Sequence, residues 1–385
     1  MIKLQSNKNI IAATTVDEVQ YLLLQVTKKT DLPMVLRGNK ALILRTVDGN
    51  DLKGFGIVFS RNRHDIKVPG VAYLDEDLSY LEEGDVIRVY PKNNSVRAIY
   101  RANAHSNFLL VTEQCNSFCL MCSQPPRNID DSHLIEELIE AVPLIDRGAS
   151  EIGITGGEPT LLGDRFFTLI RTIKNYLPDT SLHILTNGRS FSDSAMVSSL
   201  AKINHQDLML GIPLYSDLSH LHDFVVQADG AFDETIRGIL NLKRYSQKVE
   251  IRVVIHLQTY KRLPNLAEFI GRNLQFVDHV ALMGLEITGF TRANLDELWV
   301  EPNDYAEELS KAVSILSRYN IDVSIYNLQR CLLPQHLWPY AVKSISDWKN
   351  KYYAECDKCL QKSECGGFFA SSDIKRSEYI KAIES

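Results

Sequence analysis

The sequence predicts an α/β protein with a parallel sheet at its centre, a β-rich segment before it and a cysteine-rich segment after it. From Asn107 onward, short apolar stretches typical of buried strands alternate with longer stretches of helical periodicity. This alternation is the order that gives a parallel sheet with right-handed crossovers. Earlier in the chain, short apolar stretches are bounded by Gly, Asn, Asp and Pro, as in small β-rich domains. We therefore expect three domains, at residues 1–104, 105–327 and 328–385.

The composition is that of an ordinary globular protein large enough for two or three domains. The chain has 385 residues, of which 45% are hydrophobic and 23% charged. Its net charge of −6, without a basic block, argues against a nucleic-acid partner bound through phosphates. No run of about eighteen apolar residues and no signal-peptide pattern occurs, so we expect a cytoplasmic protein without a membrane partner. The seven cysteines are odd in number, which favours reduced thiols over a disulfide framework.

The first 104 residues predict a small β-rich, barrel-like domain. Its clearest unit is a hairpin, because alternating apolar positions at 85–90 and 95–100 flank turn residues at 91–94. One helix is expected at 16–28. No motif here carries chemistry, so this domain is expected either to dock a substrate or partner or to cover one end of the central domain.

The central segment predicts the strands and helices of the parallel sheet. Apolar stretches of strand length lie at 108–112, 151–155, 182–186, 208–214, 249–256, 279–285 and 321–326. Helical patterns lie between them, including 133–147, 164–177, 193–203, 233–245 and 304–319. As in full barrels, catalytic groups are expected at the C-terminal ends of the strands.

Three cysteines closely follow the first of these strands. Cys115, Cys119 and Cys122 have the spacing C-x3-C-x2-C, which places them on one loop at the strand's C-terminal end. Three thiolates can each hold one iron of a cubane cluster and leave the fourth iron open to a ligand, whereas four-cysteine ferredoxin sites only transfer electrons. The alternatives are a structural zinc site, which normally needs a fourth nearby Cys or His, and unrelated buried thiols.

A Gly-Gly-Glu-Pro bend follows the second predicted strand. Gly156 and Gly157 permit the bend and Pro159 ends it, so that backbone groups and the Glu158 carboxylate point off the strand end. Such a turn is suited to binding an amino group. The four residues alone are a weak signal, but one helix after C-x3-C-x2-C they form a very specific pair of motifs.

Together these motifs resemble the radical S-adenosylmethionine (radical SAM) superfamily over residues 107–290. The resemblance implies a partial (β/α)6 TIM-type barrel and a [4Fe–4S] cluster held by the three cysteines. It also implies that the open iron binds the amine and carboxylate of SAM, and that the Gly-Gly-Glu-Pro bend holds the amino group. Met121 stands before the third cysteine, where the family commonly has an aromatic residue, and it is the candidate adenine contact.

Further strand ends supply candidate SAM contacts. Asn187, in a Thr-Asn-Gly turn, resembles a family turn beside SAM, although it also suits an ordinary turn. Pro213 stands where the family often has a ribose-facing Ser, so the resemblance passes that contact to Ser216 or to the backbone. In the fifth strand Arg252 and His256 share one face. If that face is the interior, Arg252 is positioned to pair with the SAM carboxylate and His256 to approach the substrate. The reverse register would place both beside the helices.

Four further cysteines lie after the last predicted strand: Cys331, Cys356, Cys359 and Cys365. They suffice for a second, auxiliary [4Fe–4S] cluster or for a tetrahedral zinc site. Their C-x2-C-x5-C spacing resembles the SPASM and twitch extensions of peptide-modifying radical SAM enzymes, and four cysteines fit the shorter twitch form. The stretches 344–350 and 365–369 are similar to the radical SAM maturases of the His-Xaa-Ser system (HxsC).

The resemblance implies reductive cleavage of SAM to a 5′-deoxyadenosyl radical that modifies a ribosomally made His-Xaa-Ser repeat peptide. Expected partners are that precursor peptide, companion maturation proteins and an electron donor such as flavodoxin or ferredoxin. Two alternatives remain. A small-molecule dehydrogenase or activating enzyme on the same core would turn over without a peptide. A non-catalytic iron–sulfur or zinc scaffold would cleave no SAM.

Overall fold

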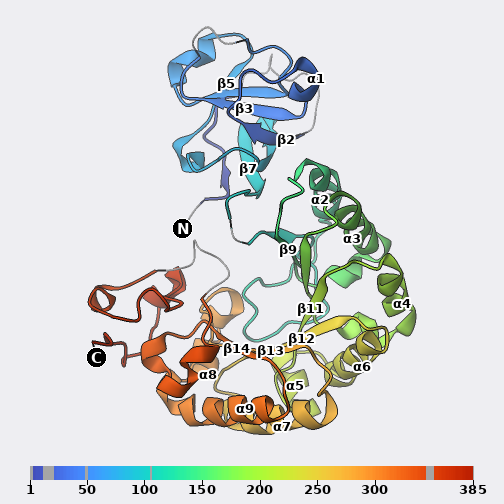
Figure 1. Cartoon of the computed structure of the whole chain (residues 1–385), viewed down its shortest axis with the longest axis vertical. Helices are drawn as coiled ribbons and strands as arrows, with labels where there is room; N and C mark the ends of the chain where they lie inside the picture. The colour runs from blue at the N-terminus through green and yellow to red at the C-terminus, as the bar shows by residue number, and fades with distance from the viewer. Residues whose placement is uncertain (1–2, 12–20, 48–50, 105, 344–350, 385) are drawn as a thin grey trace. The chain divides into compact units, whose positions relative to one another are not determined.

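The computed structural model describes residues 3–11, 21–47, 51–104, 106–343 and 351–384. The chain divides into two compact units (Figure 1). Unit 1 comprises 1–109, 132–152 and 168–181, and unit 2 comprises 110–131, 153–167 and 182–385. The three predicted domains, with limits at 104/105 and 327/328, stay predictions. The stretch 344–350, which resembles HxsC in sequence, lies outside the described residues.

Unit 1 contains a sheet in the strand order β1-β7-β6-β2-β3-β4-β5. Its strands are β1 (Gln5–Ser6), β2 (Leu22–Thr27), β3 (Lys40–Leu44), β4 (Ile57–Ser60), β5 (Val71–Tyr73), β6 (Val86–Tyr90) and β7 (Ser95–Tyr100). Strands β6 and β7 form the predicted antiparallel hairpin, with Asn94 in the left-handed region at a φ of 50°. Beyond β1, Ile10 forms an antiparallel bridge with Tyr73 of β5, the strand at the opposite edge. The segment 5–10 therefore contacts both edges of the sheet, which gives it a barrel-like closure.

The predicted helix at 16–28 is wrong in its second half. Leu22–Thr27 form β2 instead, antiparallel to β6 and parallel to β3. Leu24 and Val26 are 3% and 0% exposed and lie two residues apart, which is the period of a strand. Consecutive leucines suit a helix as well as a strand, and pairing with two neighbouring strands decides for the strand. Residues 12–20 lie outside the described part of the chain.

A buried ion pair joins helix α2 (His133–Ala141) to this sheet within unit 1. Arg88 of β6 pairs with Glu137 of α2, and their side chains are 7% and 4% exposed. The Tyr90 hydroxyl also donates to Oε1 of Glu137, at 3.1 Å. Loss of either partner would leave an uncompensated buried charge, so this contact fixes α2 on the sheet.

The second sheet is open and has the strand order β14-β13-β12-β11-β10-β9-β8. Its strands are β8 (Phe108–Leu110), β9 (Glu151–Thr155), β10 (Ser181–Leu185), β11 (Leu208–Pro213), β12 (Lys248–Val254), β13 (His279–Met283) and β14 (Val323–Tyr326). Neighbours from β10 to β14 pair in parallel. Each strand lies where an apolar stretch predicted one, and the predicted α/β class with a partial, unclosed barrel is confirmed.

Helices alternate with these strands along the chain. They are α3 (Asp164–Tyr176), α4 (Ser194–Ile203), α5 (Ser219–Val226), α6 (Ala231–Arg244), α7 (Leu263–Asn273), α8 (Leu295–Leu298) and α9 (Ala306–Arg318), with α1 (Met34–Arg37) in unit 1. In Figure 1, α4, α6, α7 and α9 follow the outside of the curved sheet. Helix α9 buries Leu309, Ala312, Val313 and Leu316, a spacing that forms one apolar stripe.

The inner face of the sheet is identified by what packs on the outer face. Val253 of β12 lines one narrow space together with Leu266 of α7 and Leu316 of α9. Its neighbours Arg252 and Val254 therefore point to the opposite face, because side chains alternate along a strand. The structure thus has the register in which Arg252 faces the barrel interior.

The C-terminal part of unit 2 is built from short helical turns and isolated bridges. Lys351 pairs with Phe368 in antiparallel orientation, and Ile325 of β14 pairs with Ala341 in parallel.

Among the residues that the structure describes, no helix is both long enough and apolar enough to cross a bilayer.

Candidate active site

The C-x3-C-x2-C motif lies on one loop after β8, called the cysteine loop below (residues 115–122). Neighbouring segments hold its backbone on two sides. The Phe118 amide donates to the Val226 carbonyl at the end of α5, at 3.0 Å. The Phe290 amide donates to the Cys122 carbonyl, at 2.8 Å. The loop thereby presents its thiols from a backbone that packing fixes in place.

The Gly-Gly-Glu-Pro bend lies against the residues just before this loop, with no room for side chains. The Gly157 amide donates to the Thr112 carbonyl at 2.8 Å, and the Glu158 amide to the Gln114 carbonyl at 2.7 Å. A Cβ on Gly156 would stand 2.6 Å from the Thr112 carbonyl oxygen, and one on Gly157 would stand 2.1 Å from that of Gln114. Because both distances are shorter than van der Waals contact allows, the bend requires two glycines.

Glu158 is enclosed by its own chain and is 0% exposed. Its Oε1 accepts hydrogen bonds from the Thr160 amide at 3.0 Å, the Thr160 hydroxyl at 2.6 Å and the Thr186 hydroxyl at 2.7 Å. Its Oε2 accepts from the Asn187 amide, at 2.6 Å. Burial raises the pKa of Glu158, and these hydrogen bonds oppose the rise. The carboxylate therefore joins the bend to the turn after β10, and its predicted contact with SAM stays a prediction.

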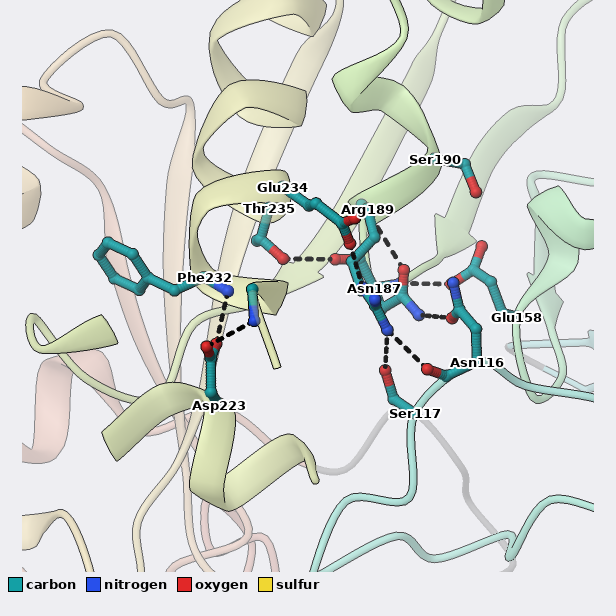
Figure 2. A network of polar contacts seen from close by, with 12 residues as sticks. Asn116, Ser117, Glu158, Asn187, Arg189, Ser190, Asp223, Phe232, Glu234 and Thr235 are labelled. Atoms are coloured by element: carbon teal, nitrogen blue, oxygen red, sulfur yellow. Dashed lines mark hydrogen bonds and ion pairs between the residues drawn. The ribbon is translucent and has the colours of Figure 1, made fainter. Parts of the chain in front are cut away.

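The turn after β10 also contacts the cysteine loop directly (Figure 2). Asn187 Nδ2 donates to Asn116 Oδ1 at 2.6 Å, and Arg189 Nη1 donates to the Asn116 carbonyl at 2.5 Å. On its other side, Arg189 Nε pairs with Glu234 of α6, at 2.6 Å. The predicted site residue Asn187 thus lies at the site, but its contacts are with the protein. Sequence reasoning missed Arg189, because a lone arginine after a turn belongs to no motif.

The three thiols of the cysteine loop have the chemistry of a cubane ligand set. All three are free cysteines with partly exposed side chains. Burial raises the pKa of Cys115 to about 11 and that of Cys119 to about 12. Iron must therefore displace a proton from sulfur, which makes cluster loading dependent on pH. Within the described ranges, no group of three or more His, Cys, Asp or Glu side chains is arranged to ligate a single ion. In a cubane each thiolate instead binds a different iron.

Tyr215, which sequence reasoning did not single out, lies beside the cysteine loop. Buried Tyr215 belongs to the same apolar cluster as Met121, and Cys119 packs against that cluster. The Tyr215 ring stacks on that of His222, with centroids 5.8 Å apart, and lies 6.2 Å from the ring of His256. Tyr215 follows the end of β11 by two residues. Its proximity to a strand end is the sequence signal that could have identified it.

His256 is 0% exposed, and burial lowers its pKa to about 4. The imidazole is therefore neutral at pH 7. Its Nδ1 is buried, and no described residue offers that atom a hydrogen bond. A neutral imidazole suits an active site from which water is excluded, because burying an unpaired charge there would be costly.

Two predicted SAM contacts are buried in the protein. Met121 is 7% exposed, within the apolar cluster that also contains Tyr215. Ser216 is 0% exposed, and its hydroxyl accepts from the Leu218 amide at 3.1 Å. Their contacts with adenine and ribose stay predictions.

Arg252 belongs to a polar layer inside the partial barrel. Its Nη1 donates to Oε1 of Glu250 at 2.5 Å, and Oε2 of Glu250 lies 2.8 Å from Nδ1 of His279. Nε2 of His183 lies 3.5 Å from Oε1 of the same carboxylate. Burial acts to raise the pKa of Glu250, but the two histidines and Arg252 outweigh it and lower this pKa below its ordinary range. Arg252 thus has a carboxylate partner within the chain, and its contact with the SAM carboxylate stays a prediction.

The four C-terminal cysteines line a single cavity in unit 2: Cys331, Cys356, Cys359 and Cys365. The chain thus brings one cysteine together with three that follow well after it in sequence. Gln329 and Phe368 line this cavity and also a second one, which lies beyond the ends of β13 and β14. The four-cysteine cavity is therefore adjacent to the end of the sheet where barrel enzymes place their active sites.

Residues 109–270 match the family model described as the Radical SAM superfamily. The matched range contains the cysteine loop, the Gly-Gly-Glu-Pro bend and the turn after β10. The chain therefore contains a radical SAM superfamily domain. That superfamily implies a [4Fe–4S] cluster and SAM as cofactors, and the thiol chemistry and steric design of the bend fit both.

The curated relatives of this domain are GTP 3′,8-cyclases. That of Campylobacter jejuni subsp. doylei is 29% identical over 151 residues, which cover 37% of this chain and 45% of the relative. The GTP 3′,8-cyclase of Nautilia profundicola is 32% identical over 156 residues, which cover 38% of this chain and 45% of the relative. The chain thus spans less than half the length of these relatives. Among solved structures, Streptococcus suis SuiB bound to S-adenosylmethionine is 18% identical with a TM-score of 0.47, and the match covers 65% of this chain and 55% of SuiB.

Proposed function

We propose that this protein is a radical SAM enzyme that modifies a ribosomally made peptide of the His-Xaa-Ser type, as an HxsC-like maturase. Its partners would be the precursor peptide, companion maturation proteins and an electron donor such as flavodoxin or ferredoxin. The observation that carries the proposal is the cavity lined by four cysteines, which gives unit 2 a second thiol site besides the cysteine loop. Four thiolates can fill every iron of an auxiliary [4Fe–4S] cluster.

At the first site, Cys115, Cys119 and Cys122 would hold the cluster, which together with SAM would supply a 5′-deoxyadenosyl radical for hydrogen abstraction from the substrate. The chain's own task is to hold the reactants and exclude water. The wall beside the cysteine loop excludes water, because it consists of buried Tyr215, neutral His256 and the apolar cluster around Met121. The bend, held against the residues before this loop by two glycines, positions its backbone at the same strand ends.

At the second site, the surroundings of the cysteines suit a peptide substrate. The cavity that shares Gln329 and Phe368 with the thiol site is also lined by Trp299, Lys375 and Arg376. Aromatic rings can pack against peptide side chains, and the two cations can pair with acidic groups. An auxiliary cluster at this position would accept an electron from the substrate radical or bind the peptide.

The test is anaerobic incubation of the reconstituted chain with SAM, a strong reductant and the candidate peptide. We expect 5′-deoxyadenosine together with a changed peptide mass. A variant with Cys115, Cys119 and Cys122 all replaced by Ala is the matched control and should give neither product. Absence of SAM cleavage by the intact chain would favour the non-catalytic scaffold. SAM cleavage that leaves the peptide unchanged would contradict the peptide substrate.

A small-molecule substrate is the second candidate, because the curated relatives of the domain are GTP 3′,8-cyclases. That function would require turnover without a peptide partner. The same incubation with GTP in place of the peptide distinguishes the two. Consumption of GTP that depends on SAM and on the intact cysteine loop would favour this candidate.

A further inference from the structure

We propose that Arg189 is a positioning residue for the cysteine loop, and that its positive charge raises the reduction potential of the cluster bound there. The inference rests on the radical SAM part of the proposed function. It does not depend on whether the substrate is a peptide or a small molecule.

Arg189 contacts the loop between its first and second cysteines. Its Nη1 donates to the Asn116 carbonyl at 2.5 Å and to the Ser117 hydroxyl at 3.1 Å. These two acceptors directly follow Cys115, so the contacts fix the backbone that carries the Cys115 sulfur. Hydrogen bonds from a charged donor are stronger than neutral ones, and the planar guanidinium imposes a geometry that a point charge cannot.

The guanidinium is itself held from the opposite side. Its Nε pairs with Glu234 of α6, at 2.6 Å. Helix α6 packs tightly on the turn that carries Arg189, because a Cβ on Gly238 would stand 2.2 Å from the Gly188 carbonyl oxygen. The Thr235 hydroxyl adds a hydrogen bond to the Asn187 carbonyl, at 3.2 Å. Figure 2 shows Arg189 lying between Glu234 and the cysteine loop.

The position of this charge decides its electrostatic effect. The Arg189 side chain is 13% exposed, so solvent and salt screen it less than they screen a surface charge. A reduced cluster carries one more negative charge than the oxidised cluster, and a nearby cation therefore stabilises the reduced form. Glu234 partly neutralises Arg189, but its carboxylate is 45% exposed and is better solvated. The net effect of Arg189 is to make reduction easier.

The experiment is a potentiometric titration of the reconstituted full chain, followed by electron paramagnetic resonance. The first cluster is identified as the signal that changes when SAM is added. Arg189→Gln should shift its midpoint to a lower potential, and Glu234→Gln should shift it to a higher one. Arg237→Gln removes an exposed cation from the same helix α6 and should leave the midpoint unchanged. Arg189→Lys keeps the charge but lacks the planar guanidinium. Its midpoint potential should therefore equal that of the wild type, while its cluster should lose iron to a chelator faster.

Opposite shifts in Arg189→Gln and Glu234→Gln support the inference. A midpoint in Arg189→Gln equal to that of Arg237→Gln would overturn it, as would iron retention by Arg189→Lys equal to the wild type. Should Arg189→Gln assemble no cluster, the Glu234→Gln midpoint decides alone, and an unshifted value refutes the electrostatic effect. A wild-type chain that assembles no SAM-responsive cluster would instead overturn the proposed function itself.

Discussion

Replacing Glu158 by Gln tests what the carboxylate of the Gly-Gly-Glu-Pro bend does. Gln has nearly the same shape but turns one oxygen into an NH2 donor. The least damaging placement keeps the amide oxygen at Oε1, where three hydrogen bonds are accepted. The NH2 group then faces the Asn187 amide, which donates to Oε2 at 2.6 Å in the native chain. Two donors would oppose each other in a site that is 0% exposed.

The expected loss of stability in Glu158→Gln follows from the one broken hydrogen bond between the Asn187 amide and Oε2. A hydrogen bond to a charged group contributes about 1.5–3 kcal/mol, and an unsatisfied buried donor costs about 1–3 kcal/mol. Because Gln can rotate or shift to relieve part of the conflict, we expect a loss of about 2–3 kcal/mol in the free energy of unfolding. A loss of this size should appear in urea unfolding of the reconstituted chain and as a Tm several degrees lower. Glu297→Gln, at an exposed position of α8, is the matched control.

A Glu158→Gln variant with wild-type stability would refute the reasoning from burial and hydrogen bonding. SAM affinity is measured in the same variant. The predicted contact with the SAM amino group would weaken binding about ten- to a hundredfold. Lower stability with unchanged SAM affinity in the loaded variant would assign Glu158 to the architecture of the bend alone.

Three further predictions concern the two thiol sites and the polar layer. Two cubanes would give about eight irons per chain, and replacing Cys115, Cys119 and Cys122 together by Ala should remove half; about four irons plus zinc in the intact chain would contradict an auxiliary cluster. Glu250 has a lowered pKa in the folded state, so it stabilises the fold at pH values above its unfolded pKa of about 4.3, and this stability is lost as the pH falls through the folded pKa. Glu250→Gln should therefore lower the free energy of unfolding by about 3–5 kcal/mol at pH 7, and this free energy should fall less steeply with decreasing pH than in the wild type. An unchanged pH dependence in urea unfolding would show that the polar layer does not contribute to stability. Cys359→Ala should still form 5′-deoxyadenosine yet leave the peptide mass unchanged, and full peptide modification would make the second site merely structural.

The fold could be predicted because strands and helices depend on local pattern, whereas the role of the cysteines as iron ligands stays a prediction. A buried strand needs a short apolar stretch, and each strand of the second sheet has one. The cysteines are recognisable because several ligands on one loop need short, fixed spacing. Strand β2 could not be predicted in this way, since Leu22–Leu24 suit a helix as well as a strand. Its pairing partners β3 and β6 come later in the chain, and only they decide its structure.

The contacts around the site could not be predicted, because they join residues far apart in the sequence. Glu158 accepts from Asn187 across 29 residues, and Arg189 reaches Ser117 across 72. No spacing rule links such pairs, and either residue alone suits a solvent-exposed turn. The same limit applies to the polar layer around Arg252, because His183 and His279 lie far from Glu250 in the sequence and yet contact its carboxylate.

The structure explains why three of the four residues of the Gly-Gly-Glu-Pro bend are needed. Gly156 and Gly157 are required because carbonyl oxygens of residues 112 and 114 occupy the space of their side chains. Glu158 is required because it gathers donors from the bend and from the turn after β10. That same turn carries Arg189, which reaches the cysteine loop. The bend, the turn and the loop thus form one connected network, so the backbone that follows Cys115 is held by residues outside the cysteine motif. The Gly-Gly-Glu-Pro motif, predicted to bind SAM, therefore also supports the loop that is predicted to hold the cluster.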